Sequence, residues 1–229
     1  MKDSEEIRLQ KIEDIWRIIV RLRGDTGCPW DRKQTPQTVQ TYLVEEAHEA
    51  ASAIREQKVA DAAEELGDVL FMVLFLVHMY EQQGDFSFAD VCDRVSEKMI
   101  GRHPHVFGET SVNTAEEVKD NWEKIKAREK DKAGRQAEPV PESLPALMRA
   151  YRMVSRLAHK KGGEWNDLET RLRDFSKRAG DLERVLASGK DMPADLLGSL
   201  LLDLVVLARI KGLRPEDSLH EVLRAKVPE

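Results

Sequence analysis

Apolar residues recur along the chain at the three- and four-residue spacing of an α-helix. One such stripe comprises Val39, Leu43, Ala47, Ala50 and Ile54. It predicts a helix over about 38–56, because these positions share one face of a 3.6-residue period. The same reasoning predicts helices over about 5–23, 59–84, 88–101 and 114–130. No segment shows the sustained alternation that is typical of a strand, so the pattern predicts an all-α protein.

A polar stretch rich in helix-breaking residues separates two such helical regions. Residues 131–145 contain Gly134 and the prolines 139, 141 and 145. Proline lacks a backbone N–H and clashes with the preceding turn, so a helix cannot continue through this stretch. The sequence therefore predicts one helical domain over 1–130, a linker over 131–142 and a second helical domain over 143–229.

Motifs of the first half recur in the second half. Arg21 lies nine residues before Trp30, and Arg156 lies nine residues before Trp165. The segment EELGDVL at 64–70 is echoed by DLLGSLL at 195–201. An ancient internal duplication explains both repeats, and chance similarity between two leucine-rich helices is the alternative.

Composition and charge narrow the possible functions. The formal net charge of −6 argues against a protein that binds nucleic-acid polymers, which would need a basic surface. The longest apolar run, Val69 to Val77, is too short for a membrane helix, which needs about 20 residues. Cys28 and Cys92 match no disulfide or metal-binding pattern. We expect a cytoplasmic protein without a membrane partner.

Two pairs of acidic residues carry the candidate chemistry. Glu46 with Glu49, and Glu65 with Asp68, each have i, i+3 spacing, which places both side chains on one helical face. Two antiparallel helices would bring the four carboxylates together, and Mg²⁺ prefers such oxygen ligands. A solvated acidic surface is the alternative. The face of the second pair nevertheless continues into apolar residues, namely Met72, Phe75, Leu76 and Met79.

Several motifs in a fixed order resemble the MazG family over about residues 10–130. They are Gly27-Cys28-Pro29-Trp30-Asp31, Gln34-Thr35, Tyr42-Leu43, Glu45-Glu46-Ala47-His48-Glu49, Glu64-Glu65-Leu66-Gly67-Asp68, Arg102-His103-Pro104-His105-Val106-Phe107, and Trp122-Glu123 with Lys126 and Glu129-Lys130. The tandem arrangement, with Leu144-Pro145-Ala146-Leu147 opening the second half, resembles two-domain bacterial members.

This resemblance implies tandem all-α helical-bundle domains and Mg²⁺-dependent hydrolysis of nucleoside triphosphates to a monophosphate and pyrophosphate. It places the metal-binding and catalytic carboxylates on Glu46, Glu49, Glu65 and Asp68, with Glu45 as an assisting neighbour. It places the substrate-binding residues on Lys98, Arg102, Trp122 and Lys126. It also implies a homodimer. We expect Trp30 and Asp31 to close a turn and pack, with Asp31 capping the next helix.

The second half departs from the metal-binding pattern. Leu196 and Ser199 stand where the first half has Glu65 and Asp68, and Arg178 falls near the position of Glu46. We therefore expect a degenerate second copy that binds no catalytic metal and has a structural role.

Alternatives to general nucleotide hydrolysis remain. One is a narrower pyrophosphohydrolase for a deoxynucleotide or a phosphoribosyl-nucleotide. Another is a non-catalytic helical binding module. Trp122 can also be an ordinary core residue, and each lysine can be a solvated helix charge. Nucleotide-pool house-cleaning is the physiological role that the resemblance suggests.

Overall fold

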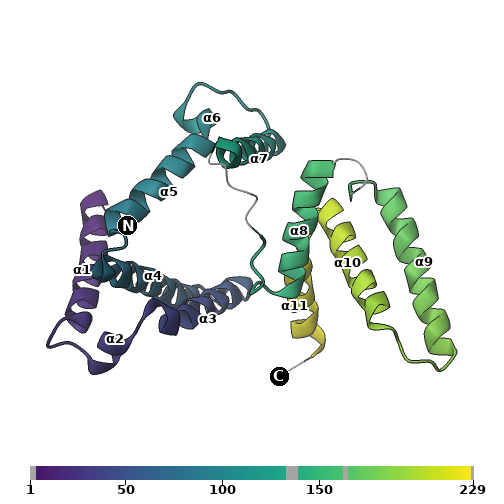
Figure 1. Ribbon diagram of the computed structural model, residues 1–229, viewed down its shortest axis with the longest axis horizontal. Helices are drawn as coiled ribbons and strands as arrows, with labels where there is room; N and C mark the ends of the chain where they lie inside the picture. Colours follow the sequence, from purple (N-terminus) through teal and green to yellow (C-terminus); the bar gives the residue numbers. More distant parts are fainter. Residues whose placement is uncertain (1–3, 133–138, 162–164, 228–229) are drawn as a thin grey trace. The chain divides into compact units, whose positions relative to one another are not determined.

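The computed structural model describes residues 4–132, 139–161 and 165–227, and this part of the chain contains α-helices and no strand. The prediction of an all-α fold is confirmed. The chain divides into two units, Met1–Glu129 and Lys130–Glu229, whose helices are labelled in Figure 1. Residues 133–138, within the predicted linker, lie outside the described residues.

The first unit contains a long helical hairpin and shorter helices around it. Its helices are α1 (Glu5–Arg23), α2 (Pro29–Lys33), α3 (Pro36–Arg55), α4 (Val59–Gln83), α5 (Phe88–Arg102), α6 (Pro104–Phe107) and α7 (Ala115–Lys132). The five helices expected from periodicity are present, with ends that differ by at most two residues. The short helices α2 and α6 were not predicted, because four or five residues are too few to show a period.

Local sequence fixes the ends of the α3–α4 hairpin. Thr35 and Thr38 form a capping box at the start of α3, and Pro36 occupies its first turn, where a missing N–H costs nothing. The hairpin turn contains Gln57, whose φ of 58° lies in the left-handed region. Gly84, with φ of 77°, ends α4 in the conformation that glycine adopts most readily. The two long helices therefore run antiparallel.

The core of the first unit lies along the second half of α4, which packs against α3 and α1. Its buried members are Ile19, Val39, Met72, Leu74, Phe75 and Met79. Burial of such side chains stabilises the fold by about 1.5–3 kcal/mol each. The core holds one end of the hairpin rigidly, and the acidic residues lie nearer its other end.

The second unit is built on a similar helical hairpin, of α9 (Leu168–Ala187) and α10 (Ala194–Ile210). These helices pack with α8 (Ala146–Lys161) and α11 (Pro215–Lys226). Val154, Leu200, Val205 and Val206 are buried here. The fold is thus a tandem of two helical units, and the origin of the second unit as a degenerate copy of the first stays a prediction. None of the described helices, in either unit, is long and apolar enough to cross a membrane.

Candidate functional site

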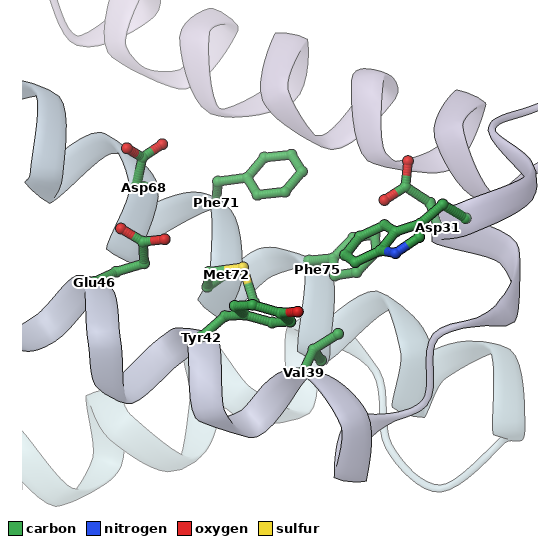
Figure 2. A pocket seen from close by; sticks show the side chains of 9 residues that line it. Asp31, Val39, Tyr42, Glu46, Asp68, Phe71, Met72 and Phe75 are labelled. Carbon is green, nitrogen blue, oxygen red and sulfur yellow. The ribbon is translucent and has the colours of Figure 1, made fainter.

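The α3–α4 hairpin brings carboxylates from both helices to one place. Carboxylate oxygens of Glu46, Glu49 and Glu65 all lie within 4.8 Å of one another. Asp68 lies beside Glu46, and Figure 2 shows both carboxylates at the same end of a pocket. Glu45 is exposed next to this group. The i, i+3 spacing within each helix and the antiparallel hairpin together produce this arrangement.

Mutual repulsion and partial desolvation raise the pKa of two of these groups. The pKa of Glu46 is raised by burial first, and then by the charges of Asp68 and Glu49. The pKa of Glu65 is raised by desolvation and then by Glu49 and Glu46. The free cluster therefore stores unfavourable electrostatic energy. A bound cation would relieve it.

The donor set fits a hard divalent cation. Carboxylate oxygens are the ligands that Mg²⁺ takes in proteins, usually with several water molecules that remain bound. The trio is only partly buried: Glu49 is exposed, while Glu46 and Glu65 are half-buried. Water and substrate oxygens can therefore complete the coordination shell.

Two of the carboxylates, Glu46 and Asp68, line a pocket of about 250 Å³ between α2, α3 and α4. Its lining comprises Trp30, Asp31, Val39, Tyr42, Glu46, Asp68, Phe71, Met72 and Phe75. In Figure 2, Tyr42, Phe71 and Met72 lie between the acidic pair and Asp31. One pocket thus joins an anionic end to an aromatic one, a combination typical of small-molecule sites.

The loop before α2 presents Trp30 and Asp31 to this pocket. A Cβ atom at Gly27 would lie 2.2 Å from the backbone oxygen of Leu22, so only glycine fits there. The guanidinium of Arg23 donates hydrogen bonds to the backbone oxygens of Asp31 and Gln34, which fixes the course of the chain.

The expectations for Trp30 and Asp31 need correction. Trp30 is 54% exposed and lines the pocket instead of packing into the core. Helix α2 begins at the N-cap Cys28 without a side-chain cap, and Asp31 lies within its first turn. Neither residue could be placed at the site from periodicity, because they lie on a five-residue helix that the preceding loop positions.

The expected substrate-binding residues form a separate group on α5 and α7. Arg102 donates hydrogen bonds to both carboxylate oxygens of Glu129, the shortest at 2.7 Å. Its guanidinium lies 5.5 Å from the ring centre of Trp122. The pKa of Glu129 is lowered mainly by these hydrogen bonds, and also by the charges of Lys98 and Lys126. The structure therefore gathers Arg102, Lys98 and Lys126 around Glu129, and it places Trp122 beside Arg102. None of them lines the pocket.

A salt bridge joins the two hairpin helices of the second unit. Arg178, near the position of Glu46 in the repeat, donates hydrogen bonds of 2.8 and 2.6 Å to the carboxylate of Asp203. Within the described residues, the trio in the first unit is the only cluster suited to a metal ion.

Comparisons with known proteins agree with this geometry. The family model described as "MazG nucleotide pyrophosphohydrolase domain" matches residues 34–107, which include all four acidic residues. The chain is 36% identical over 222 residues to the nucleoside triphosphate pyrophosphohydrolase of Escherichia coli K12, covering 93% of this chain and 83% of that protein.

Two proteins of Thermotoga maritima are also similar. One, a nucleoside triphosphate pyrophosphohydrolase/pyrophosphatase MazG, is 36% identical over 217 residues, covering 93% of this chain and 81% of that protein. The other, a mazG-related protein of known crystal structure, is 29% identical with a TM-score of 0.44 and covers 50% of this chain and 98% of its own. The chain thus shares more than a third of its residues with two of these relatives over 93% of its length and over 81% or more of theirs. This protein therefore belongs to the MazG nucleotide pyrophosphohydrolase family.

Proposed function

We propose that the protein hydrolyses nucleoside triphosphates to a nucleoside monophosphate and pyrophosphate, with Mg²⁺ bound at the α3–α4 carboxylates. The observation that carries this proposal is the trio of carboxylates within 4.8 Å beside an aromatic pocket. Family membership supplies the reaction class, because relatives are named as nucleoside triphosphate pyrophosphohydrolases.

The ligands of the metal would be Glu46, Glu49, Glu65 and Asp68, and Glu45 would add negative charge nearby. When bound, Mg²⁺ supplies positive charge to phosphate oxygens and lowers the pKa of coordinated water. The carboxylates also accept hydrogen bonds from water, so they can orient the attacking molecule and take its proton. One water molecule is consumed for each phosphoanhydride bond that breaks.

The basic group on α5 and α7 would bind the phosphate chain. Arg102 presents a planar guanidinium suited to two phosphate oxygens, and Lys98 and Lys126 add charge around it. In the structure Glu129 takes the place of such an anion. Trp122 supports the guanidinium with its ring.

The test is pyrophosphate release from the eight common ribo- and deoxyribonucleoside triphosphates, with and without Mg²⁺. We expect metal-dependent release by the wild type and a loss of at least about 100-fold in Glu49→Gln, since one ligand is removed from an exposed position without disturbing the core. Glu183→Gln, an exposed change on α9, is the matched control and should retain activity.

The same panel separates the alternatives. Activity on several nucleotides would support a role in cleaning the nucleotide pool. Activity on one deoxynucleotide, or only on a phosphoribosyl-nucleotide, would indicate the narrower enzyme. Absence of Mg²⁺-dependent release with every substrate would contradict the proposal and favour a binding module. An active Glu49→Gln variant would contradict the site assignment.

We also propose a homodimer that covers an exposed apolar stripe on α4. Leu66, Leu70 and Val73 are 52%, 40% and 40% exposed, and their i, i+4, i+7 spacing places them on one face. Exposed apolar surface of this kind is typical of protein interfaces. Light scattering should give twice the chain mass of 26.1 kDa, and Leu70→Glu should give a monomer. A monomeric wild type at about 50 μM would contradict this proposal.

A further inference from the structure

We infer that the pocket between α2, α3 and α4 binds the nucleobase of the substrate, and that Asp31 makes it prefer bases with adjacent N–H donors, guanine first. This inference rests on the proposed function, because it assumes a nucleotide whose phosphates lie at the carboxylates. It assigns the base to Trp30, Tyr42 and Phe71.

The pocket has the polarity that a nucleotide requires. Glu46 and Asp68 line one end of it, and in Figure 2 Asp31 lies at the other end, beyond Tyr42 and Phe71. A phosphate chain held through a cation at the acidic end therefore leaves the nucleoside against the aromatic side chains. The rest of the lining consists of aromatic and aliphatic side chains, which offer a base an apolar surface.

Large aromatic rings are left accessible at the mouth of this pocket. Trp30 is 54% exposed and Tyr42 is 41% exposed, and their ring centres lie 6.3 Å apart at an interplanar angle of 60°. Phe71 is stacked on Phe75, with ring centres 5.5 Å apart, so its position is fixed. A base that enters would stack on one of these faces, and aromatic stacking binds every base.

The carboxylate of Asp31 gives this aromatic site its selectivity. Among the described residues no side chain or backbone N–H donates a hydrogen bond to this carboxylate. The guanidinium of Arg23, which donates to the backbone oxygen of Asp31, interacts with the carboxylate through charge alone. An ionised carboxylate only accepts hydrogen bonds. Guanine offers N1–H and N2–H side by side, which matches two carboxylate oxygens. Thymine and uracil flank their single N–H with carbonyl oxygens, which a carboxylate repels.

The ring of Trp122 is a less suitable platform for the base. The guanidinium of Arg102 already lies over it at 5.5 Å, and the imidazole of His103 meets its ring edge-on at 4.7 Å. Trp122 therefore has a partner of its own on α5. Trp30 has an exposed ring at the pocket that contains the candidate metal ligands.

The experiment compares Trp30→Leu and Asp31→Asn with the wild type. Values of kcat and KM are measured for dGTP, dATP, dCTP and dTTP with Mg²⁺. We expect Trp30→Leu to raise KM about tenfold for all four substrates, since a stacking face is lost. We expect Asp31→Asn to reduce the preference for dGTP over dTTP about tenfold. Asp25→Asn, an exposed change in the same loop, is the matched control and should keep the wild-type ratios.

Binding of the product nucleotide provides a readout that does not depend on metal or turnover. Calorimetric titration with dGMP in the absence of Mg²⁺ should show binding that weakens about tenfold in Trp30→Leu and Asp31→Asn. Thermal unfolding should be nearly unchanged, because Trp30 is largely exposed. Tyr42→Leu serves as a second aromatic variant with the same expectation for binding.

The outcomes distinguish this inference from the proposed function. No Mg²⁺-dependent pyrophosphate release by the wild type would overturn the proposed function. Suppose the wild type is active, and Trp30→Leu and Asp31→Asn keep its KM values and base preferences within twofold. That result would overturn the base pocket but not the proposed function. A tenfold rise in KM that occurs only in Trp122→Leu would show that the base binds at Trp122 on α7. That result would also overturn the inference of a base pocket between α2, α3 and α4.

Discussion

The Arg178–Asp203 salt bridge in the second unit allows a quantitative prediction. Replacing Arg178 with methionine keeps an unbranched apolar stem but removes the charged guanidinium. Asp203, whose side chain is 8% exposed, then loses both hydrogen bonds from the guanidinium. Breaking a fully buried pair costs about 3–5 kcal/mol, whereas a surface pair contributes about 0–1 kcal/mol. Because Arg178 is 37% exposed, solvent screens part of the interaction, and we expect about 2 kcal/mol.

Hydrogen exchange of the α10 backbone amides measures this loss in the second unit without interference from the first. A loss of about 2 kcal/mol corresponds to roughly 30-fold lower protection, since 1.4 kcal/mol is a factor of ten. The double variant Arg178→Met/Asp203→Leu removes both charges and should recover most of the protection. Pyrophosphohydrolase activity should be unchanged in both, because the proposed metal site lies on α3 and α4.

Three results would contradict this reasoning. Unchanged α10 protection in Arg178→Met would mean that Asp203 is adequately solvated without its partner. The double variant could also fail to protect the α10 amides better than Arg178→Met does. The charge pair itself would then not be what holds α9 against α10. Loss of activity with intact protection would give the second unit a catalytic part that the structure does not indicate.

Two further predictions concern the first unit. The pKa of His78 is lowered, first by burial and then by Arg23, while Glu81 acts in the opposite sense. The unfolded chain therefore binds a proton that the folded chain does not, so stability should fall as pH decreases below the usual value of 6.5. Urea unfolding between pH 7.5 and 5 should show this slope, and His78→Leu should reduce it; an equal slope would show that another group is responsible. Glu129→Ala should release α7 from Arg102 and lower amide protection in α7 about fivefold, in line with a partly exposed pair worth about 1 kcal/mol; unchanged exchange would show that other contacts hold α7.

The helices could be predicted from the sequence because their causes are local. The apolar stripe that includes Val39 and Leu43 repeats with the 3.6-residue period of an α-helix. The start of α3 follows from Thr35 and Pro36, and the end of α4 follows from Gly84. The same locality explains why α2 was missed. Hydrogen bonds from Arg23 hold the backbone oxygen of Asp31 within this five-residue helix and that of Gln34 just after it. Periodicity contains no information about such contacts.

The acidic site could be predicted only in part from the sequence. The i, i+3 spacing already placed Glu46 with Glu49, and Glu65 with Asp68, on one face of each helix. Whether the two faces meet depends on the turn at Gln57 and on packing along the far end of the hairpin. The structure brings three of these carboxylates within 4.8 Å, so the prediction of a shared cluster is supported by geometry, and the role of each residue stays a prediction.

By itself the sequence determined the helices, the acidic pairs and the loss of those pairs in the second half, because each depends on residues a few positions apart. Only the tertiary structure decided which distant groups meet. It brought Trp30 to the acidic pocket, Arg102 to Glu129, and Arg178 to Asp203. These contacts arise from the approach of separate helices and loops, which side-chain packing and connecting turns control and which no local spacing specifies.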